Sequence, residues 1–268
     1  MRPSGLHVNK PVIIGLIAAV IIIFLGYRHL TRSVMAPKSV ELSVDNVEDV
    51  PELTDAIVKE LKRESMEIDI KVVDTTVKIY VEQVIKDRSS KLDVLFLHGA
   101  SLTSQDWLKI KSTDHVANWG YRSVAIDMPG KGKSPNQLSL QLARKFLDAF
   151  IRKMEMKNVV IIAPSASGQY ALPYLFNDVN NSNDFVVGFI PIAPVATPDF
   201  KEQYPNSQVK TLIVYGSKDA AQAVFLENLQ LIPNHKVVKI EDTGHGCYLE
   251  NPDAFHTALF HFLKELVP

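Results

Sequence analysis

The sequence is poor in cysteine and in net charge, and each shortage excludes a class of protein. Cys247 is the only cysteine among the 268 residues, so the chain can form neither an intramolecular disulfide nor a metal site built from several thiolates. The formal net charge of -1 gives no reason to expect nucleic acid or an acidic partner. Internal repeats and low-complexity stretches are absent from the sequence as well.

Apolar residues, in contrast, make up 46% of the chain, which suffices for one domain of about 200 residues with a substantial core. From about residue 67 onward, strand and helix patterns alternate after an antiparallel hairpin at 68–73 and 77–82 that turns at 74–76. This alternation predicts an α/β domain over residues 67–268, with a mostly parallel, eight-stranded sheet flanked by helices. The other expected strands are 93–97, 121–127, 159–163, 185–192, 211–215 and 236–240, and the expected helices are 107–119, 138–156, 168–176 and 253–267.

The N-terminus carries one uninterrupted apolar run. Residues 12–27 contain no charged side chain and are bounded by Lys10 and Arg28. The run is at the short end for a membrane-spanning helix, and a cleaved signal peptide is the main alternative. Because no small-x-small cleavage site follows it, we favour an uncleaved transmembrane signal anchor at 12–27, preceded by an N-terminal tail at 1–11.

The side of the membrane on which the main domain lies is left open by the flanking charges, since basic residues stand on both sides of the run in nearly equal number. Asn180 begins an Asn-x-Ser acceptor for glycosylation, which matters only if the domain is luminal. Residues 28–66 are expected to form a stem. Within it, Pro51 and the apolar spacing that follows predict a short amphipathic helix.

The most informative segment is 159–168, a short β-branched strand that stops at a serine flanked by small residues. A nucleophile elbow has this pattern, because a buried strand turns sharply into a helix and leaves one hydroxyl projecting from the turn. Ala163 and Ser167 replace the two glycines usual at an elbow. Ser165 is favoured over Ser167 as the nucleophile, since the large Gln169 would otherwise follow the nucleophile by two positions. Taken alone, the segment is equally compatible with a loop whose serine caps a helix.

The partners of a nucleophilic serine are present downstream. A serine hydroxyl needs a base to take its proton, and the base needs a carboxylate to fix its tautomer. With an elbow of this kind the expected chain order is serine, acid, histidine. Asp219 and His245 each follow a predicted strand, at the sheet edge expected to carry Ser165. These three residues are therefore the candidate catalytic triad.

Alternatives exist for the acid and the base. Asp219 is also placed to cap a helix that begins near Ala220, and His245 is also compatible with an exposed loop histidine. Asp242 is a competing acid, but it lies only three residues before His245, which makes the required geometry awkward.

A tetrahedral intermediate of acyl transfer needs two backbone N–H donors. Ala166, directly after the candidate nucleophile, is expected to supply one of them. Ala100, in the loop after strand 93–97, is expected to supply the other, and Gly99 allows the backbone a close approach there. We interpret His98 as a residue that orders this loop rather than as a second base.

The order of these motifs resembles that of the α/β-hydrolase superfamily over residues 67–268. Within this superfamily, the chain resembles the alpha/beta hydrolase domain-containing protein 14 family in three motifs: the Pro-Ser-x-Ser-Gly elbow, the Val-Tyr-Gly-x-x-Asp strand end and Gly-His-x-Cys-Tyr-Leu. The apolar N-terminus resembles that of the membrane-anchored A-type branch of this family. The resemblance implies an α/β-hydrolase fold, a triad of Ser165, Asp219 and His245, and hydrolysis or transfer of acyl esters. It also implies a single-pass, type II orientation. We expect no cofactor and no metal.

The substrate is bounded by the length of one connection. The superfamily usually inserts its lid where this chain has only residues 193–210, too few for a large helical cap. We therefore expect a minimal cap and an open site for small or medium acyl esters or thioesters, with water, an amine or coenzyme A as acceptor. Tyr170 and Tyr248 are candidates for the pocket or for the core. The non-glycine elbow motivates the main alternative, a non-catalytic binding or adaptor protein on the same scaffold.

Overall fold

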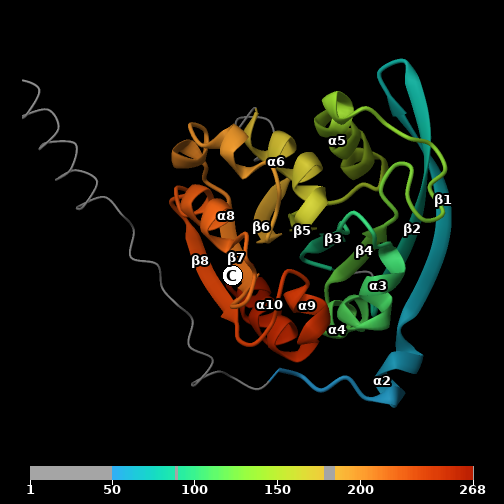
Figure 1. Cartoon of the computed structure of the whole chain (residues 1–268). Coiled ribbons are helices and arrows are strands. Elements are labelled where there is room, and N and C mark those ends of the chain that lie inside the picture. Colours follow the sequence, from blue (N-terminus) through green and yellow to red (C-terminus); the bar gives the residue numbers. More distant parts are fainter. Residues whose placement is uncertain (1–49, 88–89, 178–184, 268) are drawn as a thin grey trace, which may run out of the picture. The chain divides into compact units, whose positions relative to one another are not determined.

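The computed structural model describes residues 50–87, 90–177 and 185–267, all of which belong to one unit spanning residues 39–268. These residues form the predicted eight-stranded sheet, in the order β1-β2-β4-β3-β5-β6-β7-β8 (Figure 1). The second strand runs antiparallel to both of its neighbours, and the strands from β4 to β8 are parallel. The strands are β1 (Lys62–Val72), β2 (Thr75–Ile85), β3 (Asp93–Phe96), β4 (Arg122–Ile126), β5 (Val159–Pro164), β6 (Val186–Ile192), β7 (Lys210–Gly216) and β8 (His235–Ile240).

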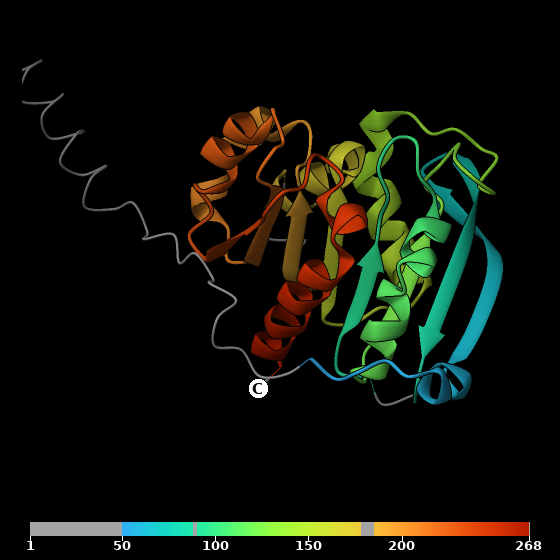
Figure 2. The same cartoon turned by 60° about the horizontal axis from the view of Figure 1, so that its bottom comes forward.

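Helices cover both faces of the sheet, as the alternating pattern predicts. The helices form two sets, which pack on opposite faces of the sheet. Figure 2 shows α10 as the red helix in front of the strands. The first face is covered by α5 (Ala143–Lys153), α6 (Gly168–Phe176) and α8 (Gln222–Leu229), and the second by α3 (Ser104–Lys109), α4 (Ser112–Asn118), α9 (Cys247–Glu250) and α10 (Pro252–Leu266).

The central strands are mostly apolar because they are buried on both faces. In β3, Val94 and Phe96 join one core cluster while Leu95 joins the other. All four residues of this strand are buried. Alternate side chains of a strand point to opposite faces, so a parallel sheet between two helical layers needs a continuous apolar run.

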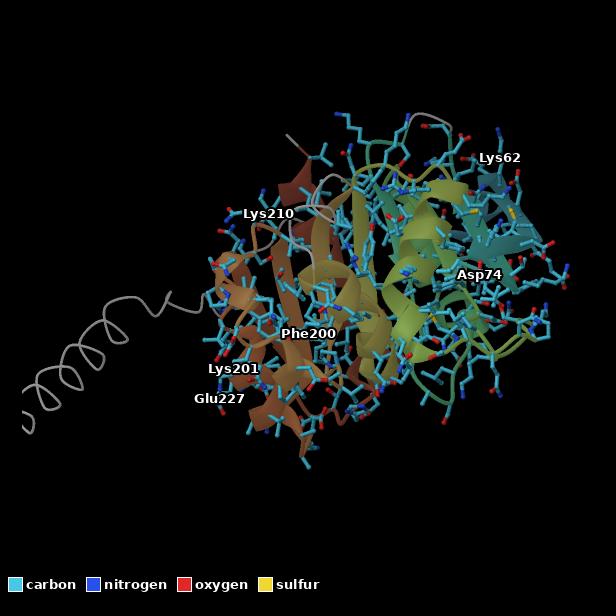
Figure 3. The ribbon with its side chains drawn as sticks, turned by 90° about the horizontal axis from the view of Figure 1, so that it is seen from above. Lys62, Asp74, Phe200, Lys201, Lys210 and Glu227 are labelled. Atoms are coloured by element: carbon cyan, nitrogen blue, oxygen red, sulfur yellow. The ribbon has the colours of Figure 1, made fainter. Side chains whose placement is uncertain are left out.

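The first hairpin is longer than the sequence predicts. The stem helix α2 (Asp55–Glu60) ends early, and β1 already begins at Lys62 instead of residue 68 (labelled in Figure 3). The turn consists of Val73 and Asp74, with Val73 in a left-handed conformation at φ 55°, rather than of residues 74–76. The first half of β1 is charged and exposed. Its backbone pairing with β2, which side-chain hydrophobicity does not reveal, therefore fixes the strand.

Two helical predictions also need adjustment. The helical region at 107–119 is divided into α3 and α4, and the helix expected at 138–156 is α5, preceded by a short 3-10 turn, η2 (Leu140–Leu142). Lys111, between α3 and α4, has φ 59°, which breaks the helix there.

The connection between β6 and β7 contains only two short 3-10 turns, η4 (Thr197–Phe200) and η5 (Tyr204–Asn206), as its length implies. It is fastened to the domain. The Tyr204 hydroxyl donates to the Thr197 carbonyl at 2.9 Å. Lys201 pairs with Glu227 of α8 at 3.1 Å, and Figure 3 labels both residues. Residues 193–210 thus lie against α8 and form no helical cap.

The predictions for the N-terminus and for glycosylation fall outside the described residues, because residues 1–49 and Asn180 are not among them. Within the described ranges, every helix is too short or too polar to cross a membrane.

Three histidines away from the candidate triad are held neutral by the fold. Burial is the main cause that lowers the pKa of His98, His115 and His256, and it lowers that of His256 to about 3. The rings of His115 and His256 lie 4.3 Å apart between α4 and α10. His256 also shares a hydrogen bond with the Ser112 hydroxyl at 2.8 Å. A charge on either ring would therefore be poorly solvated and close to the other.

The lowered pKa values of these histidines predict that the folded protein becomes less stable in acid. Their folded pKa values lie below the unfolded value of about 6.5, so below that pH the unfolded chain binds protons that the folded chain does not. The free energy of unfolding should be greatest above about pH 6.5 and fall as the pH drops, by up to about 1.4 kcal/mol per pH unit for each neutral histidine. Urea unfolding at several pH values should show a shallower fall in His256→Asn. An equal fall in variant and wild type would contradict the prediction.

Candidate active site

Ser165 stands at the sharp turn between β5 and α6, in the 3-10 turn η3 (Ser165–Ser167). Its backbone is left-handed, with φ 49°, a conformation that is rare and strained for a residue with a side chain. The Val195 N–H donates to the Ser165 carbonyl at 3.0 Å and helps to hold this conformation. The turn therefore has the strained geometry of a nucleophile elbow.

The structure brings Ser165, His245 and Asp219 together in one hydrogen-bonded chain. His245 Nε2 lies 2.9 Å from Ser165 Oγ, and His245 Nδ1 lies 2.8 Å from Asp219 Oδ2. A carboxylate oxygen can only accept, so Nδ1 carries the hydrogen and donates it. In the neutral ring the lone pair of Nε2 then faces the serine hydroxyl, which is the arrangement that a general base requires.

Asp219 holds the imidazole and also supports the turn before α8 (Gln222–Leu229), whose N-cap is Ala221. Its side chain is only 4% exposed and follows β7 directly. While Oδ2 accepts from His245, Oδ1 accepts from the Ala221 N–H at 2.9 Å, just before α8. The carboxylate thus holds the imidazole and satisfies a backbone donor at the start of a helix at the same time.

Both competing residues are engaged elsewhere. Ser167 is buried, and its hydroxyl donates to the Pro164 carbonyl at 2.7 Å. Asp242 is exposed and pairs with Lys218 at 3.0 Å. The geometry therefore favours Ser165 over Ser167 and Asp219 over Asp242.

The site is open on the side of the base. The His245 side chain is 50% exposed, although Asp219 beneath it is buried. In the part of the chain that the structure describes, no three histidine, cysteine or acidic residues gather in a way that could hold a metal ion.

Gly216 brings the loops of the acid and the base into contact. A Cβ at this position would lie 2.2 Å from the Gly244 carbonyl oxygen and 2.4 Å from that of Thr243. Just after Gly216, the Lys218 N–H donates to the Thr243 carbonyl at 2.8 Å. Only glycine permits this approach, which brings the Asp219 and His245 loops together.

The two expected backbone donors flank Ser165. Gly99 faces the serine, since a Cβ built on it would lie 3.8 Å from Ser165 Cβ. Ala100 follows Gly99 and is exposed, and Ala166 follows Ser165 and is partly exposed. Ala166 therefore adjoins the candidate nucleophile in sequence, and Ala100 follows a residue that faces it across the sheet edge.

His98 orders the loop that carries Ala100. The Met128 N–H donates to His98 Nε2 at 2.9 Å, so the imidazole hydrogen is on Nδ1, which donates to the Gly99 carbonyl at 2.8 Å. Burial lowers the pKa of His98, which favours the neutral ring that both hydrogen bonds require. The interpretation of His98 as an ordering residue fits these contacts.

Asp127 connects the loops after β3 and β4, a role not assigned from the sequence. Its two carboxylate oxygens accept from the N–H groups of Ser104 and Lys133, both at 2.7 Å. A Cβ on Gly132 would lie 2.1 Å from Asp127 Oδ2, so the turn closes tightly around the carboxylate. An aspartate at a strand end, followed by Pro-Gly-x-Gly, was the available sequence signal.

Trp107 is the second residue whose role was missed. Its indole N–H donates to the Leu97 carbonyl at 2.7 Å, and its ring stacks on Tyr248 at 4.5 Å. Since Tyr248 lies in α9, directly after the His245 loop, the stack joins that loop to the one after β3. Only the tertiary fold brings these two aromatic residues together.

The remaining candidates belong to the core. Tyr248 is 3% exposed, and Tyr170 packs edge-on against Phe146. Burial raises the pKa of the Cys247 thiol to about 12, so this cysteine is not an ionised nucleophile at neutral pH.

Comparison with curated proteins finds close relatives. Protein ABHD14A of Rattus norvegicus is 38% identical over 192 residues, which cover 70% of this chain and 78% of the relative. The Homo sapiens protein named "Putative protein-lysine deacylase ABHD14B" is 36% identical over 183 residues, which cover 66% of this chain and 85% of the relative. No protein-family model matches the chain.

Solved structures share the fold. A "predicted CIB-like hydrolase" from Thermoplasma acidophilum is 25% identical, with a TM-score of 0.68 over 76% of this chain and 100% of the other. An esterase from Exiguobacterium antarcticum is 20% identical, with a TM-score of 0.62 over 74% of this chain and 100% of the other. At that identity the second match speaks for the α/β-hydrolase fold alone.

Gly216 provides a test of the site's construction. In Gly216→Ala the added methyl group would push the His245 loop away from Asp219. We expect the rate at which a fluorophosphonate modifies Ser165 to fall by about tenfold or more, because a misplacement of about 1 Å disrupts catalytic geometry. Ala220→Ser, an exposed change in the same loop, should keep the rate. Wild-type reactivity in Gly216→Ala would show that the close approach is not required.

Proposed function

This chain belongs to the ABHD14 family of α/β-hydrolases, and on that premise we propose that it is a serine hydrolase acting on small or medium acyl esters and thioesters. The hydrogen-bonded chain from Ser165 through His245 to Asp219 carries the proposal. A scaffold that only binds a partner has no physical need for a strained serine aligned with a base and a buried acid.

The proposed reaction proceeds through an acyl-enzyme. Ser165 Oγ attacks the acyl carbonyl carbon while His245 Nε2 takes the hydroxyl proton. Asp219 keeps the imidazole oriented and stabilises its charged form. His245 then returns the proton to the leaving oxygen or sulfur, and the acyl group stays on Ser165. Water deprotonated by His245 attacks this ester, and His245 reprotonates Ser165 as the acid departs.

The N–H groups of Ala100 and Ala166 are the proposed donors to the oxyanion of each tetrahedral intermediate. Their support is positional, since Ala166 follows the nucleophile and Ala100 follows Gly99, which faces Ser165. Donors aimed at developing negative charge are among the largest single contributions to catalysis.

The open edge bears on the substrate and the acceptor. Residues 193–210 form no helical cap, and His245 is half-exposed, which supports access for a small or medium acyl group. The same access admits an amine or coenzyme A in place of water, which would make the reaction an acyl transfer. It also admits an acylated lysine side chain on another protein. Acylated lysine side chains, in addition to esters and thioesters, would be a second class of acyl donor. They are the class that the name of the human relative describes.

The non-glycine elbow offers little support for an adaptor protein. Ala163 is fully buried, and the Ser167 hydroxyl is satisfied by the Pro164 carbonyl. Both replacements for glycine are therefore accommodated without an unpaired polar group. The absence of the two glycines therefore gives no structural reason to prefer the adaptor function.

Probe labelling tests the nucleophile. Ser165→Ala should abolish covalent labelling by a fluorophosphonate and turnover of p-nitrophenyl acetate, because it removes the hydroxyl that faces His245 Nε2. Ser167→Ala, which removes only a buried hydrogen bond, should keep labelling. Labelling that persists in Ser165→Ala and vanishes in Ser167→Ala would reverse the assignment. An unlabelled, folded wild type without turnover would favour the adaptor function.

We also propose that residues 12–27 anchor the chain as a single-pass, type II signal anchor, with the residues from 28 to the start of β1 at Lys62 as the stem. The support is the uncharged, apolar character of the run and the lack of a cleavage site after it. In this orientation the domain is luminal, and Asn180 is available for glycosylation.

Glycosylation tests this orientation. In cells, an endoglycosidase should shift the mass of the full-length wild type but not of Asn180→Gln, because the substitution removes the acceptor. Asn181→Gln, which leaves Asn180 and Ser182 in place, is the matched control and should keep the shift. A wild type without any shift would place the domain on the cytoplasmic side and overturn the type II proposal.

A further inference from the structure

The proposed base stands in the most permissive backbone of the site. His245 is flanked on both sides by glycine, Gly244 and Gly246, and its side chain is half-exposed. Glycine has more conformational freedom to lose than any other residue, so a Gly-His-Gly loop does not hold itself in place. The Asp219 hydrogen bond fixes the imidazole but not the peptide bonds on either side of it.

Glu250 holds this loop from within. Its Oε2 accepts from the Gly244 N–H at 2.9 Å. The Glu250 N–H in turn donates to the Gly246 carbonyl at 3.1 Å, so Glu250 is bonded to the residues on both sides of His245. A Cβ built on Gly244 would lie 3.3 Å from Glu250 Oε1, and one on Gly246 would lie 3.7 Å from it. The carboxylate therefore lies close to the backbone of both glycines.

The peptide on the other side of Gly244, which joins it to His245, is already fixed by packing. The Gly244 carbonyl oxygen lies only 2.2 Å from the position that a Cβ of Gly216 would occupy. It is therefore packed against the end of β7 and cannot move closer to that strand. With its carbonyl against Gly216 and its N–H on Glu250, Gly244 is held from two directions. Of these two contacts, only the one with Glu250 is made by a side chain. Glu250 is exposed, so it can be replaced without opening the core.

We propose that Glu250 is a positioning residue for the proposed base: its carboxylate fixes Gly244 and thereby sets His245 Nε2 opposite Ser165 Oγ. The inference rests on the proposed serine hydrolase function. Glu250 acts through His245 and takes no part in proton transfer. Small displacements of a base from its reacting group are costly, so the hydrogen bond should affect turnover more than substrate binding.

Two substitutions separate the hydrogen bond from the charge. Glu250→Gln retains an oxygen that accepts from the Gly244 N–H, whereas Glu250→Ala has no acceptor. With p-nitrophenyl acetate, kcat of Glu250→Ala should fall by about tenfold or more, while KM stays within about twofold. Glu250→Gln should keep kcat within about threefold of wild type. Glu265→Gln, an exposed carboxylate of α10 paired with Lys236, is the matched control and should match wild type.

Hydrogen–deuterium exchange gives a readout that does not depend on activity. Amides of residues 244–249 should exchange faster in Glu250→Ala than in wild type, Glu250→Gln or Glu265→Gln, whereas exchange in β7 and β8 should be equal in all four proteins. A wild type without esterase turnover would refute the proposed function, and this exchange pattern would still decide whether Glu250 fixes the loop.

Three results in a protein with unchanged exchange in β7 and β8 would overturn the role of Glu250. These are unchanged exchange in Glu250→Ala, an unchanged kcat in that variant when the wild type is active, and equal losses in Glu250→Ala and Glu250→Gln. The last result would show that charge, rather than the hydrogen bond to Gly244, is what matters. A global loss of stability is recognised by faster exchange throughout β7 and β8, and would likewise contradict a local positioning role.

Discussion

The site depends on the close approach of two loops at Gly216. Strands β7 and β8 are parallel neighbours, with Gly216 paired to Ile240, so the chain leaves both strands at the same level of the sheet edge. The loops that follow β7 and β8 contact each other through their backbones, because Gly216 has no Cβ where Thr243 and Gly244 pass. Asp219 and His245 then meet at 2.8 Å. A side chain at Gly216 would move every later atom of the base loop relative to the acid.

Contacts that do not touch a substrate hold the remaining loops in place. His98 and Asp127 connect the loops after β3 and β4, and Trp107 connects the loop after β3 to α9. Preorganisation of this kind lets the reacting groups keep their positions without rearrangement during the reaction. The edge of the sheet therefore behaves as one connected layer, in which the loop after β5 supplies Ser165 and its neighbours keep it aligned.

Much of this arrangement could be predicted from the sequence, for an identifiable reason. Buried parallel strands have apolar sequences, and a residue that follows such a run lies at the edge of the sheet formed by the carboxyl ends of the strands. This logic brings Ser165, Asp219 and His245 together. It fails for β1, whose charged first half pairs through backbone, and for the turn at Val73. It also fails for Glu250, since the donor to its carboxylate is a backbone N–H, which any sequence would have.

The left-handed backbone of Ser165 sets stability against activity within a single residue. Glycine adopts this conformation without strain, whereas a residue with a side chain pays of order 1–3 kcal/mol. The most stable elbow for this fold would therefore have no hydroxyl at all. Selection for folding alone would drive the position toward glycine, so a serine there signals that the hydroxyl has been worth its destabilising effect.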